Sequence, residues 1–343
     1  MKFNKSKITS IVAASAASVA LSVAPAFATV VNPGEAVTIN STGGTNASDG
    51  LKTIVGFGEV QIFLENSAQL YSLESVPTAD GGEMSNYPVI KFDGLDDIGS
   101  SNSWESFTSE SNLTDSGRSG SVVNHLTYGS GASEVKVDYT IDYTYPNNYF
   151  NVTMALVSAG SDYDGLGHKF YWWTDAALAG SDSGFQFGGP TPAGQVVGGV
   201  YSEAGDQIEA YRQVEGNNLH WFSGYYTCPD TAGDECVDGE DSAGDWVGNF
   251  ADFPDAFFDS GDSTLDNGFG ISSPVSTNAT ESISFDLIFA KCLDGSPALQ
   301  CADAATGQDS LAKTGVDATP LGLGALALVA AGGIAFAVRR RQA

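Results

Sequence analysis

Apolar and polar residues alternate with a period of two along several stretches of the chain. Over residues 135–145, valine, isoleucine and tyrosine occupy the odd positions, whereas lysine, aspartate and threonine occupy the even ones. The alternation resumes over 150–156, after a turn at Pro146, and this arrangement predicts a β-hairpin with one buried face. The same pattern predicts strands at 60–64 and 283–289.

Clusters of glycine, serine, asparagine and aspartate separate these stretches, as turns between strands require. One helix of note is expected over 203–214, where Ile208, Tyr211 and Val214 would share a face. The pattern therefore predicts an all-β fold, an antiparallel β-sandwich built either as a large stacked sandwich or as two subdomains. This β-rich domain is expected to occupy residues 29–291.

The N-terminal segment has the three parts of a secretory signal peptide. Lys2, Lys5 and Lys7 precede an uncharged run over 11–24, which is shorter than the ~20 residues that a bilayer needs. Small residues in an A-x-A pattern follow and end at Ala28, so cleavage is expected after Ala28. Residues 1–28 are therefore expected to be absent from the mature protein, which would be exported.

The C-terminal segment, 311–343, also has three parts in a fixed order. An uncharged run over 321–338 would reach about 27 Å as a helix, enough to span the hydrocarbon core of a membrane. Arg339, Arg340 and Arg341 follow it and would keep that end in the cytoplasm. A pentapeptide precedes the run and consists of Leu311, Ala312, Lys313, Thr314 and Gly315.

This arrangement resembles the sorting signal of sortase substrates of Gram-positive bacteria, with Ala312 where most members of LPxTG type have proline. The alanine is similar to the LAxTG variant found in actinobacteria. The resemblance implies that sortase cuts between Thr314 and Gly315 and joins Thr314 to peptidoglycan, after a precursor stage in the cell membrane. It implies a location on the cell wall surface and covers the two ends only. A plain membrane anchor is the alternative.

Four cysteines belong to the exported part of the chain. The near pairs, Cys228 with Cys236 and Cys292 with Cys301, are the simplest of three possible connectivities, and both would be local disulfides. Zinc is the alternative, but no C-x₂-C pair is present and the compartment is oxidising. Residues 292–310 are expected to form a short tether that carries the second disulfide.

Composition excludes some partners. The chain has 343 residues and a formal net charge of −28; the mature part keeps 8 basic and 41 acidic residues, a net charge of −33. Such a chain repels nucleic acid and favours cations. Its 19 Phe, 13 Tyr and 5 Trp are sufficient for a large core.

Catalytic motifs are absent from the sequence. There is neither a G-x-S-x-G elbow nor an H-E-x-x-H helix, and the histidines expected in the mature chain are His125, His168 and His220. The segment 241–259 mixes acidic and aromatic residues more densely than any other, and two carboxylates of a glycosidase could lie within it, near 245–259. The alternative for that segment is a core strand with solvated acids.

Two kinds of ligand are compatible with the residue types. Aromatic rings could stack on sugars, and oxygen-rich loops could bind Ca²⁺; no other cofactor is indicated. The candidate glycan-binding residues are Trp221, Tyr225 and Trp246. The candidate calcium ligands are Asp162, Asp164, Asp259 and Asp262.

The sequence thus predicts an exported protein anchored to peptidoglycan by sortase, whose β domain is non-catalytic and serves interaction or structure, with glycan or calcium as candidate ligands. The alternative is a wall-attached carbohydrate-active enzyme with paired carboxylates. The sequence leaves open the substrate, the sortase class and any isopeptide bond.

Overall fold

The protein is an all-β sandwich of three sheets in a computed structural model. The structure describes residues 29–31, 36–46, 48–56, 60–70, 88–99, 103–181, 183–214, 216–225, 243–258, 267–292 and 296–305. The predicted signal peptide, sorting motif and membrane span lie outside these ranges. No helix within them is long and apolar enough to cross a membrane.

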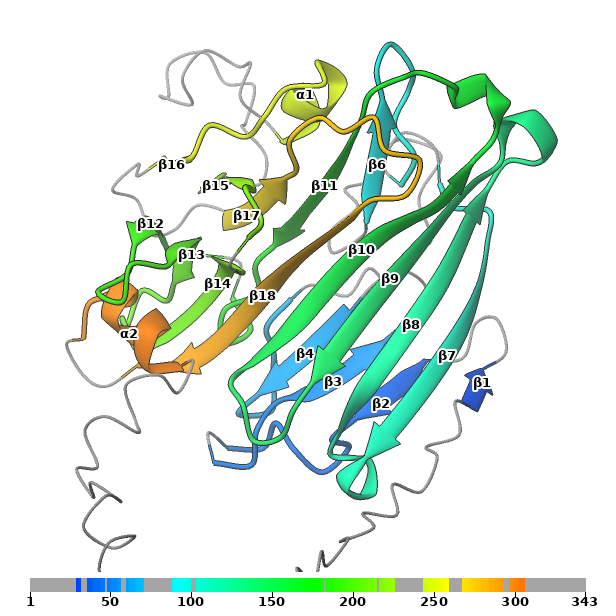
Figure 1. Ribbon diagram of the computed structural model, residues 1–343. Coiled ribbons are helices and arrows are strands. Elements are labelled where there is room, and N and C mark those ends of the chain that lie inside the picture. The colour runs from blue at the N-terminus through cyan, green and yellow to red at the C-terminus, as the bar shows by residue number, and fades with distance from the viewer. Residues whose placement is uncertain are drawn as a thin grey trace, which may run out of the picture.

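A nine-stranded antiparallel sheet forms one layer (Figure 1). Its order is β1 (Thr29–Val31), β7 (Ser106–Thr114), β8 (Ser119–Tyr128), β9 (Val135–Tyr143), β10 (Tyr149–Ala159), β18 (Ser282–Lys291), β14 (Gln207–Gln213), β13 (Val196–Tyr201) and β12 (Phe185–Pro190). β9 and β10 form the predicted hairpin, and the strands predicted at 60–64 and 283–289 are also confirmed.

Two smaller sheets cover one face of this layer. The five-stranded sheet has the order β16 (Ala256–Phe257), β15 (His220–Tyr225), β17 (Asn267–Ser272), β11 (His168–Asp175) and β6 (Val89–Phe92). The four-stranded sheet has the order β2 (Val37–Ile39), β3 (Lys52–Val55), β4 (Val60–Leu64) and β5 (Ser67–Ala68). Among the strands that the structure describes, every pair is antiparallel except β15 with β16.

Helical elements are short and lie between or after the strands. They are η1 (Asp115–Gly117), η2 (Gly131–Ser133), η3 (Ser161–Tyr163), α1 (Ala243–Gly248) and α2 (Ala298–Ala305).

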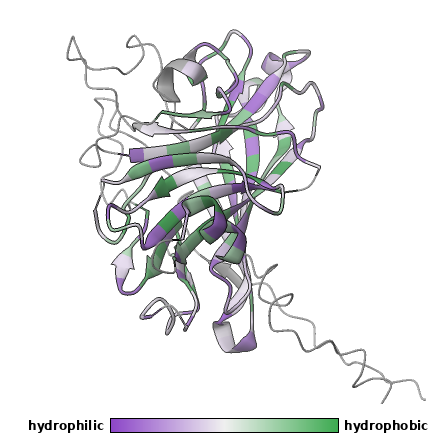
Figure 2. Ribbon diagram, turned by 90° about the vertical axis from the view of Figure 1, so that its left-hand side faces the viewer, coloured by the Kyte–Doolittle hydropathy of each residue, from purple (hydrophilic) through white to green (hydrophobic). Residues whose placement is uncertain are grey.

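One continuous apolar core joins the three sheets. On β9 and β10 every second side chain is buried, so the strands have one apolar and one polar face, and Figure 2 shows the alternation of hydropathy along the strands. Ile62, Tyr139 and Trp172, from the three different sheets, are buried in the same core. A single core favours the large stacked sandwich over two subdomains.

The prediction of a helix over 203–214 is wrong, because those residues include strand β14. β14 lies between β13 and β18 and is buried on both faces: Tyr211 packs in the main core, whereas Ile208 and Ala210 pack in a second cluster on the other side of the sheet. A strand that is apolar on both faces loses its alternation, so its apolar spacing can match a helical period by chance.

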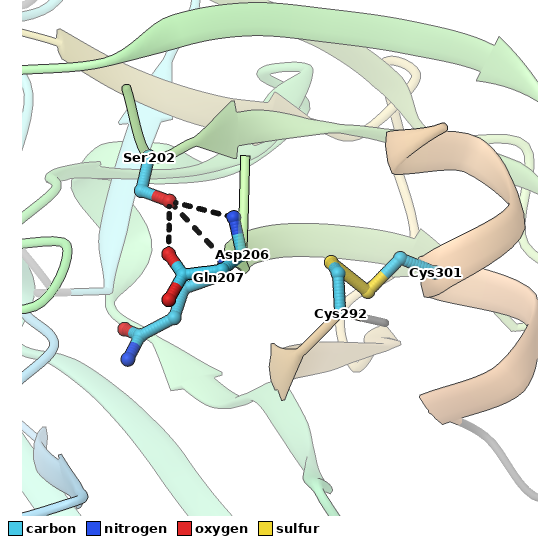
Figure 3. Close-up of a disulfide and its surroundings, with 5 residues drawn as sticks. All are labelled: Ser202, Asp206, Gln207, Cys292 and Cys301. Carbon is cyan, nitrogen blue, oxygen red and sulfur yellow. Dashed lines mark hydrogen bonds between the residues drawn. A yellow bond between two sulfur atoms is a disulfide. The ribbon is translucent and has the colours of Figure 1, made fainter. Parts of the chain in front are cut away.

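The second cluster is covered by α2, which lies within the predicted tether. Ala302 is buried there, and Asp303 accepts a hydrogen bond from the backbone N–H of Ala193, 2.9 Å away. The predicted Cys292–Cys301 disulfide is confirmed and joins the residue after β18 to α2 (Figure 3). Cys228 and Cys236 lie outside the described residues.

Replacing both Cys292 and Cys301 by serine should lower the free energy of unfolding by about 2–3 kcal/mol, because the bond restricts the unfolded chain and an eight-residue helix has little stability alone. Urea unfolding of the double variant and the parent chain measures the difference. Both proteins keep Cys228 and Cys236, so the loss reports this bond. An unchanged unfolding midpoint would show that α2 is held by packing alone.

Candidate functional site

The outer face of the five-stranded sheet, which points away from the nine-stranded sheet, carries a cluster of charged and aromatic groups. Alternation along β11 directs Phe170 and Trp172 into the main core and places Tyr171 and Trp173 in a separate outer cluster. The two adjacent tryptophans therefore face opposite sides of the sheet, and both are buried.

The segment 243–258 covers this outer face. Val247 and Phe253 are buried against the sheet, and Trp246 packs in a tilted arrangement against Phe222, with ring centroids 5.3 Å apart. Phe253 also donates its backbone N–H to Ser272 Oγ at 2.9 Å. The aromatic residues of this segment, among which the sequence placed candidate glycosidase carboxylates, thus form a small core with the outer face of the sheet.

The acids of the same segment pair with basic groups on the sheet. Asp252 accepts a short hydrogen bond from Lys169, whose side chain is only 2% exposed. Asp255 lies 2.9 Å from Nδ1 of His220, and its other oxygen accepts the backbone N–H of Trp221 at 3.1 Å. These contacts hold both ends of the 252–255 turn against the sheet.

His220 links the two carboxylates. Its Nε2 lies 3.8 Å from Asp252 Oδ2, and its Nδ1 faces Asp255. These contacts form a row of four side chains, Asp255, His220, Asp252 and Lys169, which fastens the covering segment to β15 and β11.

Tyr171 lies directly beneath this row. Burial raises the pKa of its phenol above the ordinary value, and the charge of Asp252 raises it further. The hydroxyl donates a hydrogen bond to the backbone carbonyl of Ala251 at 2.9 Å. Because the Tyr171 phenol stays neutral, its hydroxyl keeps this hydrogen bond and helps to hold the segment 243–258 against the sheet.

The three histidines of the chain are dispersed, and each lies against a carboxylate. His125 Nδ1 is 2.6 Å from Asp138 on the outer face of the nine-stranded sheet, and His168 Nε2 is 3.4 Å from Glu281. Burial lowers the pKa of His168. No group of three or more His, Cys, Asp or Glu side chains that could hold a metal is present among the residues that the structure describes.

Trp221, a candidate glycan-binding residue, lies in the interior of the sandwich. Its indole is 5% exposed and packs between the sheets, against the glycines at 188 and 198. Tyr225, the last residue of β15, pairs with Asn267 of β17. The side chain of Tyr225 lies outside the described part of the chain. Trp246 is half-buried and stacks on Phe258, with centroids 6.1 Å apart.

The candidate calcium ligands are only partly described. Asp162 lies in η3 and Asp164 directly after it, and both are exposed. Asp259 and Asp262 lie outside the described residues, as do Ala28 and the pentapeptide Leu311–Gly315.

Sequence reasoning missed Lys169 and Asp252 as partners. Lysine in the apolar run of β11 was the available signal, since a buried ammonium needs a carboxylate nearby. The partner could not be found, because 83 residues separate the two.

Comparisons with known proteins identify a distant structural likeness. No family model matches the chain, and no curated protein matches its sequence. Among solved structures, it is similar to a bacterial glucoamylase complexed with acarbose, at 14% identity and a TM-score of 0.46. The match covers 81% of this chain and 38% of that chain, so this chain spans less than half of the enzyme.

Proposed function

We propose that this chain is an exported surface protein that sortase joins covalently to peptidoglycan through Thr314. The observation that carries the proposal is the order of the pentapeptide 311–315, the uncharged run 321–338 and three arginines, with a signal segment at the other end. Each part alone is common, but the order is that of a protein held at a membrane until it is transferred to the wall.

The position of α2 supports close attachment of the domain to its anchor. α2 ends at Ala305, and the pentapeptide begins at Leu311. Five intervening residues reach at most about 18 Å when fully extended. The disulfide between Cys292 and Cys301 ties this part of the chain to the end of β18, so the sandwich would be displayed directly above the wall.

We propose that the displayed sandwich is a non-catalytic domain for interaction or structure. In support, Asp252 and Asp255 pair with Lys169 and His220, and the rings around them are packed against one another. A glycosidase instead needs a protonated acid and a free carboxylate that face each other across a bound sugar. Glycan and calcium are the ligands to test first, and assays for new reducing ends separate the binding domain from a carbohydrate-active enzyme.

Thr314→Ala tests the anchoring directly. The variant should lose at least tenfold of its covalently wall-linked protein and accumulate in the membrane or the medium, because the acyl-transfer site is lost. Thr306→Ala, outside the pentapeptide, is the matched control and should be anchored normally. Wall fractions that are solubilised only by muramidase measure both variants. Undiminished wall linkage of Thr314→Ala would refute the proposal.

A further inference from the structure

The segment 273–281 crosses from one layer of the sandwich to the other. It connects β17, in the five-stranded sheet, with β18, in the nine-stranded sheet (Figure 1). Residues 274, 275 and 277–280 are exposed, and Val275 is 55% exposed. Few apolar contacts therefore hold this crossover, and segments of this kind open at a low free-energy cost.

Polar contacts to β11 and β10 hold the crossover instead. His168, the first residue of β11, exchanges two backbone hydrogen bonds with Ser276, of 2.8 and 2.9 Å. At the other end of the crossover, the carbonyl of Glu281 accepts the backbone N–H of Leu156 on β10 at 2.8 Å. The side chains of His168 and Glu281 face each other, so this pair links the five-stranded sheet to the residue that precedes β18.

The two facing atoms are shut off from water. Nε2 of His168 lies 3.4 Å from Oε2 of Glu281, and within the described part of the chain neither atom has a hydrogen-bond partner. The imidazole is 2% exposed, and the rings of Phe92 and Phe170 lie 5.7 and 6.1 Å from it, centroid to centroid. β6 and the crossover otherwise face the imidazole with Phe92 and Ser276, so among the described residues the charge that acts on it is that of Glu281.

Folding makes His168 harder to protonate. Burial lowers the pKa of the imidazole below its ordinary value of 6.5, and the negative charge of Glu281 opposes this effect without cancelling it. The unfolded chain therefore takes up the proton at a higher pH than the folded chain. The stability is complete above pH 6.5 and is lost as the pH falls below this value. Carboxylates ordinarily titrate at about pH 4, so this window belongs to histidine.

We propose that His168 and Glu281 form an acid-sensitive contact that holds the crossover 273–281 against β11. When the imidazole takes up a proton, the ring must reach water, and the backbone pairing of His168 with Ser276 separates. This end of the sandwich then opens before the rest and exposes the rings of Phe92 and Phe170, which are buried beside the contact. The inference goes beyond the proposed function and does not depend on anchoring.

Hydrogen exchange of the full chain, exported and purified in detergent, measures this opening at about pH 7.5 and about pH 5.5. Rates are corrected for the intrinsic pH dependence of exchange. Peptides that span 273–281 should lose about fivefold or more of their protection in acid, whereas the central strands β9 and β10 should keep theirs. His168→Gln should reduce the loss to less than about twofold, because its side chain does not titrate.

Glu281→Gln tests which of the two groups takes up the proton. Without the negative charge His168 becomes still harder to protonate, so the loss of protection in acid should increase. His168→Phe is a second variant that does not titrate, and its apolar ring suits a site beside Phe92 and Phe170. It should also abolish the acid response, even if His168→Gln does not fold. His125→Gln, on the outer face of the nine-stranded sheet, is the control and should leave the response unchanged.

Three results would overturn the inference. One is a parent chain that keeps its protection in acid, or a loss that persists in both His168 variants. Another is a Glu281→Gln variant that no longer responds to acid, since the carboxylate would then be the titrating group. The third is an equal loss in β9 and β10, which would show global unfolding and not the opening of this end.

Discussion

Trp221→Ala is expected to lower the free energy of unfolding by about 3–5 kcal/mol, the usual cost of removing a buried tryptophan. The indole lies on the inner faces of β12 and β13: a Cβ at position 188 or 198 would come within 2.1 or 2.2 Å of its ring. Glycine at both positions makes room for the ring, so alanine at 221 would leave a cavity that the rigid sheets cannot close.

Urea unfolding followed by far-UV circular dichroism measures this change without relying on tryptophan fluorescence. Trp246→Ala is the matched control, because its ring is half-buried in the outer cluster, and a loss of about 1–2 kcal/mol is expected. A Trp221→Ala variant of nearly unchanged stability that had lost glycan binding would restore Trp221 as a ligand platform.

Asp286→Ala should destabilise the protein by about 3–5 kcal/mol, because it leaves the Arg212 guanidinium buried without its counter-ion. Arg212 Nε donates to Asp286 Oδ2 at 3.0 Å, and both residues are 7% exposed. Asn151 also donates to Asp286, at 2.9 Å, and Tyr149 covers the guanidinium at 4.8 Å. The loss therefore includes hydrogen bonds as well as charge.

A double variant distinguishes an unpaired charge from lost packing. Arg212→Met combined with Asp286→Leu should recover most of the stability, since a buried ion pair replaced by apolar groups is often neutral or stabilising. Glu134→Ala, which removes the partly exposed pair with Lys136, is the control and should change stability by less than about 1 kcal/mol. If the double variant is as unstable as Asp286→Ala, the network acts through shape and not through charge.

The sequence alone was sufficient to predict the fold class and the strands that have one buried and one solvent-exposed face. β9 and β10 have every second side chain in the main core, and this burial produces the alternation from which they were predicted. The Cys292–Cys301 disulfide was also predictable, because a close pair of cysteines in a chain predicted to be exported has few other partners. The signal peptide and the sorting signal are sequence motifs and stay predictions.

The tertiary structure decided the identity of elements that are buried on both faces and the partners of charged groups. β14 was mistaken for a helix because α2 and the main core cover it from two sides, a fact that no local window contains. Lys169 with Asp252 and Arg212 with Asp286 meet across 83 and 74 residues. The local pattern of apolar and polar residues indicates whether a position is buried or exposed to solvent. Which distant strands contact each other depends on the order of strands in the sheets. That order decides whether an aromatic side chain is buried in the core and which basic group an acidic side chain pairs with.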